Sequence, residues 1–160
     1  MRILTLNTWH NNGPWRQRRD ALVQGIVQYA PDILLLQELF DADWSNELQA
    51  RLGFPYLVST QCSHSGLVVL SKLAAHRSEI YRMKTKSPFE TYWRYALWAE
   101  LGSDGYRLSV STRIFPGSFR TMRHGKHRWV SSGCSWKSIA RTAASPLLPE
   151  ILIALRIQWP

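Results

Sequence analysis

Four consecutive apolar residues at positions 33–36, Ile-Leu-Leu-Leu, constrain the fold more than any other feature of this sequence. A short apolar run between two segments of helical periodicity is typical of a strand covered on both faces. The pattern predicts one helix that begins at Trp15 and ends before Pro31, and a second that Asp43 caps and Gly53 closes. The centre of the domain is therefore expected to be a buried strand flanked by helices.

Strand-like runs fill most of the remaining sequence up to residue 111. They lie at residues 2–8, 56–59, 66–71, 78–83, 93–101 and 107–111, with a hairpin turn over 101–106. Strands and helices that alternate in this way predict an α/β domain. A chain of 160 residues with 45% hydrophobic residues is long enough for one such domain with a substantial core.

The composition changes near Thr112. Residues 1–111 hold 12 Lys and Arg against 10 Asp and Glu, a net charge of +2, whereas residues 112–160 hold 8 against 1, a net charge of +7. This basic tail keeps no sustained period of 2 or 3.6, and only residues 138–144 and 151–157 have a weakly structured pattern. We therefore expect the domain to end near residue 111 and a different, poorly structured tail to occupy residues 112–160.

The cysteines and the apolar segments indicate the compartment. Cys62 and Cys134 have neither a disulfide nor a metal-site spacing, so a reducing environment is expected. The strand-like pattern starts at Arg2 and leaves no room for a signal peptide, and the apolar stretch at 151–155 is too short to span a bilayer. These features predict a soluble cytoplasmic protein with no transmembrane segment.

Two polar residues lie at the ends of the first two predicted strands. Asn7 ends the first, and Glu38 comes just after the apolar run at 33–36. Ligands of open α/β sheets gather at the carboxyl ends of strands, where a carboxylate can bind magnesium and an Asn can hold a phosphate oxygen. On spacing alone, the commoner explanation is two polar residues that finish their strands at the surface.

Three motifs decide between these readings, because their order and spacing resemble one family. LNTW at 6–9, PDILLLQE at 31–38 and SGLVVLSK at 65–72 resemble the opening of the endonuclease/exonuclease/phosphatase superfamily, which has the deoxyribonuclease I-like fold. The resemblance covers about residues 2–111. It implies an α/β fold, here a partial four-layer α/β sandwich, and descent from a metal-dependent hydrolase of phosphodiesters or phosphomonoesters.

The same resemblance implies roles for individual residues. Asn7 is expected at the phosphate and metal site, Glu38 is expected to bind magnesium, or manganese in its place, and Arg94 is expected to face the site. A surface cation on a strand remains the alternative for Arg94. His10 follows the Asn7 strand and is expected near the site, whereas the His124–His127 pair lacks a third ligand and is expected to be accidental.

The later motifs of the family are absent from the sequence. The family expects Thr-His-Leu, then Gly-Asp-Phe-Asn, then Ser-Asp-His, but here Thr112 is followed by Arg113 and Ile114. In one shifted frame, codons allowed for residues 112–128 can spell SHLSWKFQDDEARQAQ, and those for 145–154 can spell AVLAGDFNS. A single-base loss near codon 112 explains both motifs, the charge jump and the early end. We therefore predict a truncated phosphoesterase that is inactive as translated.

Other functions and a folding difficulty follow from the same features. A non-catalytic binding protein would use the basic tail on nucleic acid or an anionic membrane, and a non-functional fragment would bind nothing. The substrate stays open among nucleic acid, inositol phosphate and sphingolipid, although a net charge of +2 over residues 1–111 argues mildly against a duplex-DNA nuclease. In the family one sheet comes largely from each half, so the front half alone is expected to leave its inner sheet face uncovered.

Overall fold

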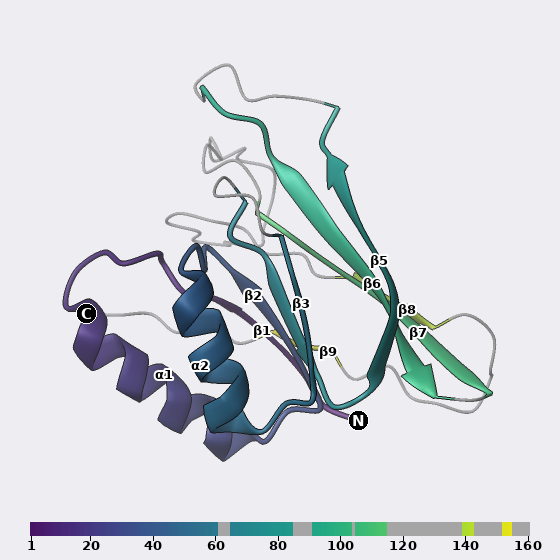
Figure 1. Cartoon of the computed structure of the whole chain (residues 1–160), viewed down its shortest axis with the longest axis horizontal. Helices are drawn as coiled ribbons and strands as arrows, with labels where there is room; N and C mark the ends of the chain where they lie inside the picture. The colour runs from purple at the N-terminus through teal and green to yellow at the C-terminus, as the bar shows by residue number, and fades with distance from the viewer. Residues whose placement is uncertain (61–64, 85–90, 104, 115–138, 143–151, 155–160) are drawn as a thin grey trace, which may run out of the picture.

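The structure is a computed structural model and describes residues 1–60, 65–84, 91–103, 105–114, 139–142 and 152–154. These residues form two helices and nine strands (Figure 1). In chain order they are β1 (Ile3–Asn7), α1 (Trp15–Tyr29), β2 (Ile33–Gln37), α2 (Ala42–Leu52), β3 (Tyr56–Ser59), β4 (Val68–Ser71), β5 (Ala74–Arg82), β6 (Tyr95–Ser103), β7 (Tyr106–Arg113), β8 (Ile139–Thr142) and β9 (Leu152–Ala154).

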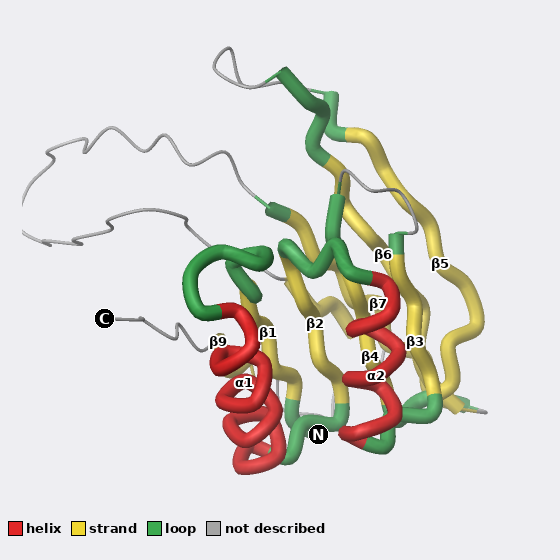
Figure 2. Tube along the Cα trace, turned by 60° about the vertical axis from the view of Figure 1, so that its left-hand side comes forward, coloured by secondary structure: helices red, strands yellow, loops and turns green. Residues whose placement is uncertain are grey.

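Two sheets lie face to face. The first has the strand order β3-β4-β2-β1-β9, with β1 parallel to β2 and to β9, and the second has the order β5-β6-β7-β8. Both helices cover the face of the first sheet that points away from the second (Figure 1, Figure 2). The described residues thus build three layers of the predicted α/β sandwich, and the fold class is confirmed.

The apolar run at 33–36 is buried on both faces, as predicted. Successive side chains of a strand point to opposite faces, and all four residues are at most 1% exposed. Leu34 and Leu36 pack towards the helices, in a cluster with Leu22, Trp44 and Leu48. Ile33 and Leu35 pack towards the second sheet, in a cluster with Ile3, Val69, Leu97, Leu101, Leu108 and Val110.

That second cluster corrects one expectation. The inner face of the first sheet is not left uncovered by the front half, because β5, β6 and β7 all precede residue 114 and cover it. The sequence between residues 74 and 113 therefore belongs to a separate sheet. Two short strands of the tail extend the two sheets: β8 pairs with β7, and β9 pairs with β1.

The helix boundaries agree with the sequence except at one cap. Helix α1 ends before Pro31, and Gly53 closes α2 in the left-handed conformation, with φ of +67°. The cap of α2 is Asp41 rather than Asp43: its Oδ1 accepts the Trp44 N–H at 2.9 Å. An N-cap side chain accepts a hydrogen bond from the backbone N–H two or three residues further along the chain. Asp43 lies in the first turn of α2, one residue before Trp44, so its side chain does not cap the Trp44 N–H. Neither helix of the described residues is long and apolar enough to cross a membrane.

Candidate active site

The carboxyl ends of β1 and β2 bring Asn7 and Glu38 together. The parallel register pairs Asn7 with Gln37, the last residue of β2, so Glu38 is the first residue after that strand. The pairing continues one residue further, because Thr8 donates to the Gln37 carbonyl oxygen from its N–H at 2.9 Å and from its Oγ1 at 3.1 Å. Neighbouring strands are about 4.8 Å apart, so the two polar residues lie side by side on one rim of the sheet.

Asn7 offers a hydrogen-bond donor at this rim. Its Oδ1 accepts the N–H of Trp9 at 2.5 Å, which fixes the side chain against the chain that follows. The amide oxygen is thereby engaged, and the amide nitrogen is the group suited to an anion. A neutral donor of this kind can hold a phosphate oxygen without adding charge.

Glu38 leaves the strand in a left-handed conformation. Its φ is +58°, a value that non-glycine residues rarely adopt. The next residue is fixed across the rim, since the Leu39 N–H donates to the Gly66 carbonyl oxygen at 2.9 Å. Backbone strain of this kind costs about 1–3 kcal/mol and tends to occur at functional sites, where it directs a side chain.

The Glu38 carboxylate is the kind of oxygen ligand that magnesium prefers. Magnesium takes oxygen ligands, keeps several waters and is commonly bound through one or two carboxylates together with substrate phosphates. The described part of the chain contains no group of three or more His, Cys, Asp or Glu that could hold a metal. Within the described part of the chain, a magnesium ion here would be held by Glu38 together with water and a phosphate.

Gly66 supports the Glu38 turn, and its replacement should disturb it. A Cβ at position 66 would lie 3.0 Å from the Leu39 nitrogen and from Phe40 Cε1, and its φ is +51°. Gly66→Ala is therefore expected to lower the free energy of unfolding by about 1–3 kcal/mol, measured by urea denaturation. Gly25→Ala in α1 is the control, because a Cβ there meets nothing within 4 Å and should stabilise the helix by up to about 1 kcal/mol. Equal effects at both positions would contradict this account.

Gln37 joins the two sheets beneath the rim. It is fully buried, and its Nε2 lies 3.0 Å from Thr5 Oγ1, 3.2 Å from the Leu35 oxygen and 2.6 Å from Thr112 Oγ1. Thr112 belongs to β7, so this one amide links the candidate site to the second sheet. No role was predicted for Gln37 from the sequence, although a lone amide ending a strand of buried apolar residues was the available signal.

Arg18 is a second residue that the sequence analysis missed. It is 3% exposed, and its guanidinium donates to the carbonyl oxygens of Thr8 (2.8 Å), His10 (3.0 Å) and Asn12 (2.6 Å). Burial lowers the pKa of this guanidinium from its usual value. The side chain thus fixes the loop that follows Asn7. An Arg among the early positions of α1 gives no sequence signal of such a role.

Arg94 lies one residue before the second sheet's strand β6. The first pairs of β6 with β7 join Ala96 to Arg113, next to Thr112. Its guanidinium lies 5.0 Å from the centre of the Tyr92 ring, and its Nη2 donates to the Tyr92 hydroxyl at 3.2 Å. The structure therefore brings Asn7 and Glu38 together, whereas Arg94 lies against Tyr92.

His10 contacts Phe40 near the rim, and the predicted accidental pair His124–His127 lies outside the described residues.

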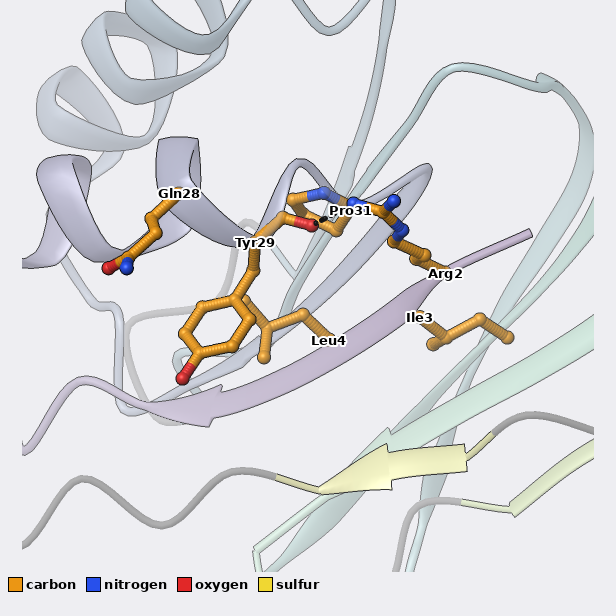
Figure 3. Close-up of a pocket in the computed structure, with 6 residues that line it drawn as sticks. All are labelled: Arg2, Ile3, Leu4, Gln28, Tyr29 and Pro31. Atoms are coloured by element: carbon orange, nitrogen blue, oxygen red, sulfur yellow. Dashed lines mark hydrogen bonds between the residues drawn. The ribbon is translucent and has the colours of Figure 1, made fainter.

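A pocket of about 240 Å³ lies at the other end of β1 (Figure 3). It is lined by Arg2, Ile3, Leu4, Gln28, Tyr29 and Pro31. Arg2 closes one side, with its Nη1 donating to the Tyr29 carbonyl oxygen at 3.0 Å. The five residues of β1 from Ile3 to Asn7 span about 13 Å, so this pocket does not form part of the candidate site.

Comparison with known proteins bears on the family and the fold of this chain. The model of the Endonuclease/Exonuclease/phosphatase family matches residues 4–147. Among solved structures, a D. rerio TDP2 humanized by 14 mutations has 21% identity and a TM-score of 0.58, over 74% of this chain and 48% of that one. D. rerio TDP2 complexed with a single-strand DNA product has 20% identity and a TM-score of 0.54, over 69% and 43%.

The catalytic domain of human Nocturnin with bound sulfate has 18% identity and a TM-score of 0.50, over 71% of this chain and 49% of that one. The chain thus spans about half the length, or less, of these similar structures. No curated protein sequence matches it. At such identities the structural likeness shows the fold.

Proposed function

Because this chain belongs to the endonuclease/exonuclease/phosphatase family, we propose that it is a magnesium-dependent phosphoesterase by descent that retains only the first half of its active site. The observation that carries the proposal is the register of β1 and β2, which sets Asn7 beside Glu38 at the carboxyl ends of two parallel strands. The sequence up to about residue 111 forms the front half of the domain, and the basic tail is the product of a shifted reading frame.

Each retained residue has a task in this proposal. Glu38 would hold the magnesium ion, which, when bound, supplies positive charge to a phosphoryl group. Asn7 donates from its amide nitrogen to a phosphate oxygen and orients it. Arg94 adds positive charge from the second sheet, where it can stabilise the negative charge that develops during attack.

The proposed substrate is a phosphodiester or phosphomonoester, and nucleic acid is the favoured class. Support comes from the similar TDP2 structure, which was solved with a single-strand DNA product. Catalysis also needs a group that takes the proton of the attacking water. The family supplies that group from motifs that are absent after Thr112, so turnover by this chain is expected to be very low.

Glu38 provides the test of this proposal. In a magnesium titration followed by NMR, Glu38→Gln is expected to weaken binding by about ten-fold or more, because the carboxylate is the charged oxygen ligand at the rim. Glu47→Gln is the control, since Glu47 lies on α2 and pairs with Arg19 and Arg51. Equal magnesium affinity in the wild type and Glu38→Gln would contradict the proposed metal site.

Turnover provides the complementary measurement. Glu38→Ala is expected to make no measurable difference to phosphodiester hydrolysis by the 160-residue chain, because residues that act as a unit lose their effect when their partners are missing. A clear magnesium-dependent rate that Glu38→Ala abolishes would show that the chain is active. Salt-dependent nucleic-acid binding that is lost when residues 112–160 are deleted would instead favour the binding-protein alternative.

A further inference from the structure

The loop after Asn7 holds two large residues in the left-handed conformation. Trp9 has φ of +56° and His10 has φ of +50°. Large non-glycine residues adopt such values only where the surrounding structure determines them. This loop is therefore built to a particular shape immediately beside the candidate site.

Arg18 determines that shape. Its buried guanidinium binds three carbonyl oxygens of the loop, and its Cζ lies 5.0 Å from the centre of the Trp9 ring. The far edge of the same indole lies near Gly13, where a Cβ would be 3.6 Å from Trp9 Cζ3. The indole is thus supported on the protein side by a cation and by backbone.

Although it is supported in this way, the Trp9 side chain remains 47% exposed. An indole with only a packing role would be expected to bury more of its surface, since large aromatic side chains contribute to stability chiefly through burial. Trp9 comes two residues after Asn7, and Phe40 comes two residues after Glu38. Phe40, which is 37% exposed, contacts the His10 ring with ring centres 4.9 Å apart. An aromatic residue therefore follows each of the two proposed site residues at the same spacing.

We propose that Trp9 stacks on the base of a nucleoside phosphate whose phosphate group lies at Asn7 and Glu38. This inference rests on the proposed function, because Asn7 and Glu38 set the position of the phosphate. A flat, exposed indole offers the stacking face that a planar base requires. An inositol ring would need several hydroxyl partners, and an acyl chain would need an extended apolar groove, and neither is what a single exposed indole provides.

The test compares two probes on the full chain in the presence of magnesium chloride. AMP and ribose 5-phosphate share the sugar phosphate and differ by the base. In an NMR titration the wild type is expected to bind AMP about ten-fold more tightly than ribose 5-phosphate. Trp9→Ala should remove this preference and leave the affinity for ribose 5-phosphate unchanged, whereas Trp9→Phe should keep most of it.

Tyr56→Ala is the matched control. Tyr56 is also an exposed aromatic residue, but it pairs with Ser71 at the end of the sheet away from Gln37, and its loss should leave the preference intact. Equal wild-type affinities for AMP and ribose 5-phosphate, both dependent on Glu38, would overturn the stacking role and leave the phosphate site standing. If neither probe binds, the proposed phosphate site is contradicted and the stacking role falls with it. If Trp9→Ala does not fold, the comparison of AMP with ribose 5-phosphate on the wild-type chain still tests the stacking role.

Discussion

Translation of the shifted frame from about codon 112 is expected to give a protein that hydrolyses a phosphodiester about 10⁴-fold faster than the present chain, in a magnesium-dependent reaction. The present chain keeps Asn7 and Glu38 but lacks the later acid–base and charge-stabilising motifs. General acid–base catalysis contributes about 10²–10⁴ in rate and a positioned charge stabiliser about 10²–10³. Because such groups act together, restoring them together should recover more than either alone.

The experiment begins with the gene read in all frames from codon 100 to beyond codon 160. The shifted frame is expected to stay open through His-Leu, Gly-Asp-Phe-Asn and a downstream Ser-Asp-His. The repaired protein is then assayed beside its Glu38→Gln variant, which should return the rate almost to that of the present chain. A closed shifted frame, or a repaired protein no faster than the present one, would contradict the frameshift proposal.

The sequence predicted those parts of the fold that depend on neighbouring residues. The apolar run at 33–36, the end of α1 before Pro31 and the closing Gly53 are local signals, and the structure has each of them. The start of β5 at Ala74, four residues before the predicted strand, was missed. Its first residues are two alanines, which have little strand preference, and pairing with β6 decides their conformation.

The packing of the second sheet over the first and the backbone conformation at the site could not be predicted from local sequence signals. Gln37 and Thr112 are 75 residues apart, and their contact exists only because β7 packs over β2. The left-handed backbone at Glu38 has no local signal, since it depends on the Gly66 carbonyl across the rim. The positions of Asn7 and Glu38 were predictable because Asn7 ends β1 and Glu38 directly follows β2, and parallel strands end at one edge.

Gln37→Leu is expected to lower the free energy of unfolding by about 2–3 kcal/mol. Leu has a similar volume, so the effect should come from hydrogen bonds rather than from a cavity. Thr112 is 0% exposed, and its hydroxyl loses the donor that Gln37 Nε2 provides. A buried polar group without its partner costs about 1–3 kcal/mol. Urea denaturation measures the change, and Gln24→Leu on the exposed face of α1, expected within about 0.5 kcal/mol of wild type, is the control.

A double-mutant cycle tests whether Gln37 and Thr112 interact directly or whether each substitution destabilises the fold independently. Thr112→Val should destabilise the wild type more than it destabilises Gln37→Leu, with a coupling of at least about 0.5 kcal/mol, because the hydroxyl and the amide act on each other. Replacing both partners by apolar groups should recover part of the lost stability, since no buried donor or acceptor of the pair then remains unpaired. Strictly additive effects would mean that the 2.6 Å contact does not hold the sheets together. A coupled result would make Gln37 a residue through which the second sheet holds the end of β2, next to Glu38.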